Sequence, residues 1–382
     1  MFTAVASEKV KGLISVMKLR HPQSSLQNFA KNENLDALLI SNLTNIRYLC
    51  GFSGSSGALA LARGNWAFFT DGRYTQQANK QVRGASVQIG SASPTTLAAR
   101  WIAGRMRGKT AARIGLEAEF TTLAVKDRIS SELRCLLGRS RYRLVATSGI
   151  VEKLRSRKDR REIEQIRNAV DLASGIFPRV LLATHSGTTE NEVAAEIEYL
   201  ARRTGAEKMS FDTIVASGPN SALPHARPTQ SKLGSGFVVL DYGVILGGYC
   251  SDMTRTVLVG RTGKEARRIY SAVLEAQLAG IAAVRAGVET QIVDAAARGV
   301  LRKHRLDKYF THSLGHGVGL EIHEPPRLAK GQKQKLEAGM VVTIEPGVYI
   351  PGSGGVRIED MVLVTQNGCE VLTPTPKELT IC

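Results

Sequence analysis

Residues 237–246 read FVVLDYGVIL, an apolar run typical of a β-strand that is interrupted by one carboxylate, Asp241. A buried carboxylate without a partner costs several kcal/mol, so its place in such a strand needs an explanation. Three further carboxylates stand in similar strand-like runs: Asp252 in YCSDMTRTVLVG (249–260), Glu345 in MVVTIEPGVYI (340–350) and Glu359 in VRIEDMVLVTQNG (356–368). We therefore expect these strands to meet at one polar centre.

A histidine completes this set of residues. His316 lies in LGHGVG (314–319), where the flanking glycines let the backbone bend and bring an imidazole close to a cluster of anions. Four crowded carboxylates repel one another strongly, and bound cations are the simplest way to stabilise them. The pattern predicts a site for two divalent ions.

Five separated motifs carry a resemblance to a known family. They are LDYG (240–243), SDMTRT (251–256), GHGVGLEIHE (315–324), IEPGVY (344–349) and RIED (357–360). In this order they resemble the motifs of the metallopeptidase family that contains aminopeptidase P, prolidase and methionine aminopeptidase. All five metal-ligand positions of the family are filled, and the match spans roughly residues 150–375.

The resemblance implies how the metal ions are held. Asp241 and Asp252 would bind one ion, and Asp252, His316, Glu345 and Glu359 the other, with Asp252 and Glu359 bridging the two. An oxygen-rich site with one nitrogen and no thiolate favours Mn²⁺ first, then Co²⁺ or Fe²⁺, over a structural zinc.

The resemblance also implies roles for four residues in catalysis. Glu345 would take a proton from the attacking water and pass it to the leaving amine of proline. His225 and His323 match positions that bind substrate and stabilise the oxyanion. His312 matches a histidine beside the site in aminopeptidase P. The spacing along the chain adds a fifth residue: Arg357, two positions before Glu359 on a predicted strand, should point to the same face as that ligand and fix a carboxylate.

The first part of the chain has a different organisation. Short apolar runs alternate with helical patterns, which indicates an α/β layer structure. NIRYL (45–49) and TDGRY (70–74) resemble the accessory N-terminal domain of the proline-specific members and of creatinase. We expect residues 1–150 to form this creatinase-like α/β domain. Residues 151–382 should form an α+β pita-bread (creatinase/aminopeptidase) catalytic domain.

The proline-specific members comprise aminopeptidases and dipeptidases. Because GFSGSSG (51–57) and TDGRY (70–74) look more like the aminopeptidases, we expect cleavage of Xaa-Pro bonds at peptide N-termini. Arg327 supports the alternative, an Xaa-Pro dipeptidase (prolidase), since small prolidases carry an arginine near this position that binds the dipeptide's free carboxylate. The complete ligand set disfavours two metal-free alternatives. One is a binding protein of the same fold, and the other is creatinase.

Composition restricts the partners and the compartment. The 382 residues, 43% hydrophobic and 22% charged, suit two globular domains. Five scattered cysteines, no continuous signal-peptide core and no apolar run of membrane-spanning length predict a cytoplasmic protein with no membrane contact. The family habit suggests a homodimer. The net charge of +17 comes from basic residues all along the chain, so we expect no specific nucleic-acid partner beside the proline-containing peptide substrate.

Overall fold

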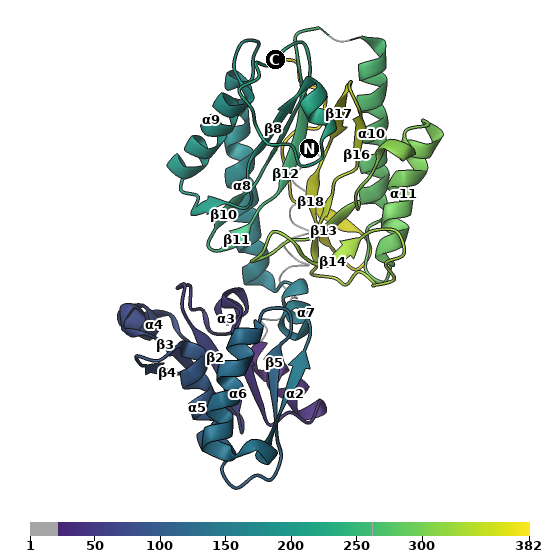
Figure 1. Cartoon of the computed structure of the whole chain (residues 1–382). Coiled ribbons are helices and arrows are strands. Elements are labelled where there is room, and N and C mark those ends of the chain that lie inside the picture. Colours follow the sequence, from purple (N-terminus) through teal and green to yellow (C-terminus); the bar gives the residue numbers. More distant parts are fainter. Residues whose placement is uncertain (1–21, 262) are drawn as a thin grey trace. The chain divides into compact units, whose positions relative to one another are not determined.

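The computed structural model describes residues 22–261 and 263–382. They form two compact units, one up to Arg155 and the other from Ser156 (Figure 1). We name them the N-terminal unit and the C-terminal unit. The predicted division after residue 150 falls at the start of the helix that leads into this boundary. No helix among the described residues combines the length and the apolar composition needed to cross a bilayer.

The N-terminal unit is built on one mixed sheet of six strands, in the order β4-β3-β2-β1-β5-β6. The pairs β1–β5, β5–β6 and β3–β4 are parallel, and β1–β2 and β2–β3 are antiparallel. Helices alternate with these strands, as the sequence predicts. The elements are α2 (Pro22–Asn32), β1 (Ala37–Ile40), α3 (Leu43–Cys50), β2 (Ala58–Ala62), β3 (Asn65–Thr70), η1 (Gly72–Tyr74), α4 (Thr75–Gln81), β4 (Ser86–Ile89), α5 (Pro94–Met106), β5 (Ala112–Glu117), α6 (Leu123–Leu137), η2 (Arg139–Arg141), β6 (Tyr142–Thr147) and α7 (Ile150–Ser156).

In its described residues, the C-terminal unit contains four long helices and a set of short strands. Every strand pair described in it is antiparallel. Its first elements are α8 (Arg160–Ala183), α9 (Glu190–Arg203), β7 (Lys208–Met209), β8 (Ile214–Ser217), η3 (Gly218–Ala222), β9 (Gly236–Tyr242), β10 (Val244–Leu246), β11 (Tyr249–Cys250) and β12 (Met253–Val259). They are followed by α10 (Lys264–Ala283), α11 (Thr290–Lys303), η4 (Asp307–Tyr309), β13 (Gly315–Gly317), β14 (Glu324–Leu328), β15 (Val341–Ile344), β16 (Gly347–Ile350), β17 (Gly354–Arg357), β18 (Asp360–Val364) and β19 (Cys369–Val371).

The helices of the C-terminal unit enclose its strands from two sides. Figure 1 shows α8 and α9 on one side and α10 and α11 on the other. The strands form two three-stranded sheets, β12-β9-β8 and β11-β10-β7, a five-stranded sheet, β14-β13-β15-β18-β19, and the hairpin β16-β17. One apolar core joins α8 and α9 to β8, β9 and β12. A second core joins α10 and α11 to the later strands.

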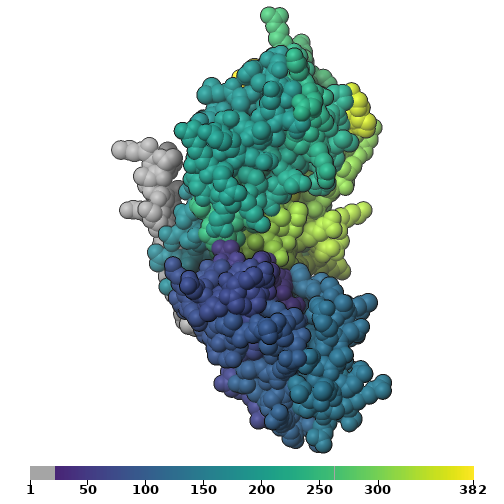
Figure 2. All heavy atoms as spheres, turned by 60° about the vertical axis from the view of Figure 1, so that its left-hand side comes forward, coloured from purple at the N-terminus to yellow at the C-terminus, as the bar shows by residue number. Residues whose placement is uncertain are grey.

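These two cores belong to two halves that repeat one arrangement. We define the first half as residues 160–259 and the second half as residues 264–371. The helices α9 and α11 have 14 residues each and begin at positions 190 and 290. The first N–H of each helix donates to a later segment of its own half, Glu190 to Ser231 O and Thr290 to Gln334 O. In Figure 2 the first half (teal) covers much of the visible face of this unit, and the second half (green to yellow) appears at its edge.

Candidate metal centre

Two antiparallel ladders bring the four predicted carboxylates together. In the first half, Asp241 lies in β9 and Asp252 directly precedes β12, the partner strand of β9. In the second half, Glu345 directly follows β15 and Glu359 directly precedes β18, and these strands also pair. The backbone N–H of Glu359 donates to the carbonyl of Thr254 (3.1 Å), which connects the two halves at the centre.

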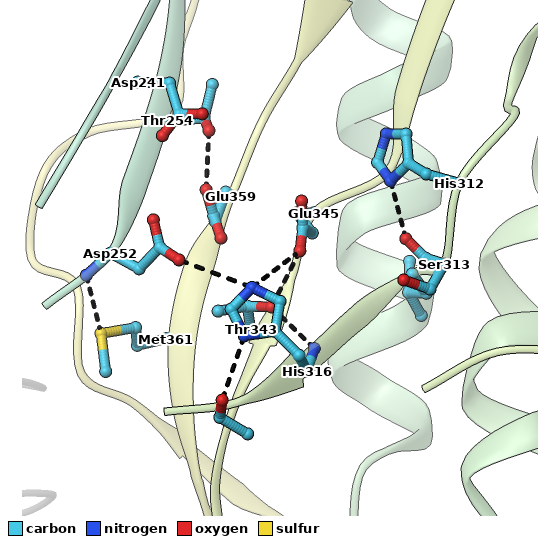
Figure 3. Close-up of polar contacts among 12 residues, drawn as sticks. Asp241, Asp252, Thr254, His312, Ser313, His316, Thr343, Glu345, Glu359 and Met361 are labelled. Carbon is cyan, nitrogen blue, oxygen red and sulfur yellow. Dashed lines mark hydrogen bonds and ion pairs between the residues drawn. The ribbon is translucent and has the colours of Figure 1, made fainter. Parts of the chain in front are cut away.

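His316 on β13 faces this cluster (Figure 3). Its Nε2 lies 3.6 Å from a carboxylate oxygen of Asp252 and 3.4 Å from one of Glu345. Its Nδ1 lies 3.0 Å from the carbonyl of Gly317, so the neutral ring donates there and leaves Nε2 to accept. One ligand atom each from Asp252, His316 and Glu359 lie within 4.8 Å of one another, a spacing that can hold a metal ion.

Burial makes this cluster unfavourable without cations. Burial, followed by the charges of Asp241 and Glu345, raises the pKa of Asp252 well above its ordinary value. Burial and the charge of Asp252 do the same to the pKa of Glu359, and burial raises the pKa of Glu345 to about 8. Burial also lowers the pKa of His316 to about 4, so its imidazole is neutral at neutral pH. Divalent cations would let these carboxylates ionise side by side.

One unpaired oxygen supports the fit of this donor set to metal ions. Asp241 Oδ1 is buried and has no hydrogen-bond partner among the described residues. Its other oxygen, Oδ2, accepts a hydrogen bond from Arg357 Nη2. Buried polar atoms are nearly always satisfied, and a cation would satisfy Oδ1. Four carboxylates and one neutral imidazole are suitable ligands for the predicted divalent ions.

Two threonine hydroxyls orient the proposed ligands, and sequence reasoning missed both. Thr254 Oγ1 donates to Glu359 (2.6 Å). Thr343 Oγ1 donates to Glu345 (3.1 Å) and accepts from the backbone N–H of His316 (3.1 Å). Each threonine lies two positions from a carboxylate of its own chain segment, Thr254 after Asp252 and Thr343 before Glu345. Since side chains alternate along a strand, a search for polar residues at this spacing would have found them.

His312 and Arg357 belong to one hydrogen-bonded network beside the centre. His312 Nε2 lies 2.9 Å from the hydroxyl of Tyr349, and that hydroxyl accepts from Arg357 Nη1 (2.7 Å). Burial, followed by the charge of Arg357, lowers the pKa of His312 to about 4, so its ring is neutral. The network continues through Arg357 to the carboxylate of Asp241.

An open cavity of about 940 Å³ contains this centre and every residue that the sequence predicts for the site. His225 and His323 are exposed in it, one from each half. The ring centroid of His323 lies 4.4 Å from that of His316. Burial, followed by the charge of His225, lowers the pKa of His323. The predicted residues that line the cavity are Asp241, Asp252, His316, Glu345, Glu359, His225, His312, His323 and Arg357.

Arg327 lines the same cavity. It lies on β14, directly opposite His316 on β13, so its side chain leaves the sheet on the same face as that histidine. The side chain is exposed, and it makes no hydrogen bond or ion pair to any other residue that the structure describes. Its guanidinium is available to a ligand in the cavity.

The fold and the centre together define the chain as a metallopeptidase with the pita-bread architecture. Residues 164–366 match the model of metallopeptidase family M24, and residues 23–157 match that of the creatinase/prolidase N-terminal domain. The chain therefore belongs to metallopeptidase family M24. These matches confirm the predicted family resemblance, fold class and enzyme class.

Three solved structures are similar over nearly the whole chain. The Xaa-Pro dipeptidase from Bacillus anthracis is 38% identical with a TM-score of 0.88, covering 94% of this chain and 99% of its own. The X-Pro aminopeptidase from Thermotoga maritima is 34% identical with a TM-score of 0.83, covering 91% and 98%. The prolidase from Pyrococcus furiosus is 33% identical with a TM-score of 0.82, covering 92% and 99%.

Proposed function

We propose that this chain is a metal-dependent Xaa-Pro dipeptidase. The sequence motifs favoured an Xaa-Pro aminopeptidase and gave the dipeptidase as the alternative, so the preference is now reversed. Two of the three similar structures described above are dipeptidases, and the one from Bacillus anthracis has the higher identity. The Thermotoga maritima aminopeptidase keeps Xaa-Pro aminopeptidase activity as the second candidate.

The observation that carries the proposal is the position of Arg327 in the metal cavity. A dipeptide that ends in proline places a free carboxylate only one residue beyond the scissile bond. A guanidinium opposite His316 would bind that carboxylate through two parallel hydrogen bonds. A longer peptide has no carboxylate there and would gain nothing from this arginine.

The proposed metal ligands are the five residues of the centre. Asp241 would hold one ion, His316 and Glu345 would hold the other, and Asp252 and Glu359 would contribute to both. The donor set favours Mn²⁺, with Co²⁺ or Fe²⁺ as alternatives. When bound, two such ions supply Lewis-acid chemistry, because they activate water and polarise the carbonyl of the scissile bond.

The chain's own residues would handle the proton and the developing charge. Glu345 accepts a proton from the attacking water and delivers it to the nitrogen of the leaving proline. His225 and His323, exposed in the cavity, donate hydrogen bonds to the oxyanion of the tetrahedral intermediate. His312 contacts the hydroxyl of Tyr349, and Arg357 contacts the carboxylate of Asp241. Through these contacts the two residues hold the side chains of the centre in position.

The test compares kcat/KM for an Xaa-Pro dipeptide, its C-terminal amide and an Xaa-Pro-Yaa tripeptide. We expect a strong preference for the free dipeptide. Arg327→Ala should lower kcat/KM for the dipeptide about 10- to 100-fold, the value of a charge-assisted hydrogen bond, and should leave the amide unaffected. Arg227, an exposed arginine of the same cavity, is the matched control. Efficient cleavage of the tripeptide would instead identify an Xaa-Pro aminopeptidase.

A further inference from the structure

A buried carboxylate outside the metal centre has no described ion-pair partner. Glu190, the first residue of α9, is 0% exposed. It accepts five hydrogen bonds from neutral donors: Ser217 N (2.7 Å), Ser217 Oγ (2.9 Å), Asn220 Nδ2 (2.8 Å), Thr229 N (3.0 Å) and Thr229 Oγ1 (2.7 Å). Burying a carboxylate in this way is expensive unless all its acceptor positions are used, which is the case here.

The five donors belong to the two ends of one surface segment, residues 217–229. Ser217 ends β8, Asn220 lies in η3, and Thr229 lies where the chain returns to α9. Asn220 also donates to the carbonyl of Arg227 (3.3 Å). The carboxylate of Glu190 therefore joins the two ends of this segment and holds it as a compact loop.

His225 lies in this segment, between the tied ends. Its side chain lines the metal cavity, and its ring forms no hydrogen bond or ion pair to the rest of the described chain. The backbone around it sets where the ring lies. Two further contacts tie that backbone to the second half: Pro224 O accepts from Arg357 Nη1 (3.0 Å), and Ser221 Oγ accepts from Gly355 N (2.8 Å).

We infer that Glu190 is a positioning residue that holds His225 at the metal cavity. Glu190 does not line the cavity and reaches the reaction only through the segment 217–229. The inference rests on the proposed role of His225 in stabilising the oxyanion. It predicts that a change at Glu190 affects turnover only while His225 is present, which a general structural role would not do.

A double-mutant cycle tests this dependence. The four proteins are the wild type, Glu190→Gln, His225→Ala and the double variant, measured with an Xaa-Pro dipeptide at saturating metal. Glutamine keeps the size of the side chain but turns an NH₂ group toward donors. We expect Glu190→Gln to lower kcat about tenfold in the wild type and less than about twofold when His225 is absent. Bound metal should stay unchanged in all four.

A matched control comes from the second half. Asp294, a buried carboxylate on α11, contacts the backbone of Leu314 and not the segment 217–229. The effect of Asp294→Asn on kcat should be the same with and without His225. Coupling of Asp294 to His225 as strong as that of Glu190 would overturn the inference, because it would reflect a general loosening of the site.

Two outcomes separate this inference from the proposed function. An equal loss from Glu190→Gln in both backgrounds overturns the inference alone. A wild-type kcat in His225→Ala overturns the role of His225 and, with it, the inference. If Glu190→Gln does not fold, Thr229→Val decides, because it removes one hydroxyl donor and keeps the side-chain shape. That variant should lower kcat about threefold, again only while His225 is present.

Discussion

The two halves of the C-terminal unit begin with similar helix pairs, α8–α9 and α10–α11, but hold their catalytic segments differently. In the first half, the carboxylate of Glu190 binds neutral donors at both ends of the segment that carries His225. In the second half, Asp294 and Arg298 on α11 form an ion pair (2.8 Å), and Arg298 donates to the carbonyls of Phe310 (2.8 Å) and His312. One half uses a lone carboxylate, and the other uses a charged pair.

The difference extends to the histidines themselves. The ring of His312 is fixed by contacts to Ser313 O (2.8 Å) and to the hydroxyl of Tyr349 (2.9 Å). The ring of His225 forms no such contact within the described chain. A histidine that binds substrate needs a ring free to form hydrogen bonds and a backbone that is held in place. A histidine that supports the centre can have both its ring and its backbone held by other residues. The comparison shows that the ring of His312 is held by contacts of its own, whereas the ring of His225 depends on the backbone that carries it.

Removing the metal should have the largest effect and should involve both halves equally. Chelation is expected to abolish hydrolysis, and Mn²⁺ or Co²⁺ should restore it best. Asp252→Asn from the first half and Glu359→Gln from the second should each lower bound metal and reduce kcat by more than about 100-fold. This loss exceeds the one expected when a residue that only hydrogen-bonds to a metal ligand is replaced. Metal analysis and initial rates measure this. Full turnover by a demonstrably metal-free sample would contradict the proposed mechanism.

Replacing the two exposed histidines, one from each half, tests how each half contacts the substrate. His225→Ala and His323→Ala should each lower kcat about 100-fold or more, as loss of an oxyanion donor does, with metal content nearly unchanged. Glu345→Gln should be worse because it removes a ligand and the proposed base together. Steady-state kinetics with metal analysis distinguish these cases. A histidine variant that keeps wild-type kcat would show that only one half contacts the oxyanion.

Replacing the two threonines tests how each half supports its proposed metal ligands through a hydrogen bond. Thr254→Val and Thr343→Val should each weaken metal binding about tenfold, since each removes a hydrogen bond to a proposed ligand. The control is Thr256, a buried threonine of β12 whose hydroxyl bonds, among the residues that the structure describes, to the backbone of Arg357 alone. Metal titration measures the three affinities. An unchanged affinity in one of the two test variants would show that its half holds the metal without this support.

The helix N-termini provide the smallest expected difference. Thr189 caps α9 through a reciprocal pair of hydrogen bonds with Glu192, whereas Glu289 makes no side-chain cap bond at α11. Thr189→Ala should lower the free energy of unfolding by about 1 kcal/mol, and Glu289→Ala by less than about 0.5 kcal/mol. Urea unfolding at a fixed metal concentration measures both. Equal losses would show that the two helices begin in equivalent ways after all.

The residues of the candidate metal centre could be picked out from the sequence because they break a simple pattern. A charged side chain in an apolar strand is conspicuous, and the four carboxylates at such positions, together with His316 in its glycine-rich turn, also matched family motifs. The residues that hold the site in place are not conspicuous. Glu190 and Asp294 lie in amphipathic helices, where an acid usually indicates a solvated face. Only the tertiary structure reveals that both are buried.

The high positive charge is also distributed differently from what the linear sequence suggested. Residues 20–155 contain 20 Lys and Arg against 8 Asp and Glu, whereas residues 156–382 contain 28 against 25. The excess therefore belongs mainly to the N-terminal unit. The nature of the metal, the homodimer and the cytoplasmic location remain predictions.

The connection between the two halves at the centre has a consequence for how the protein is made. Asp252 is synthesised about a hundred residues before Glu359, and the bond from Thr254 to Glu359 spans 105 positions. At ordinary translation rates, roughly 5–20 residues per second, the first half waits about 5–20 s for its partner. During that interval its two carboxylates have no complete binding site. The proposed metal centre can therefore form only after the strands of the second half have emerged from the ribosome.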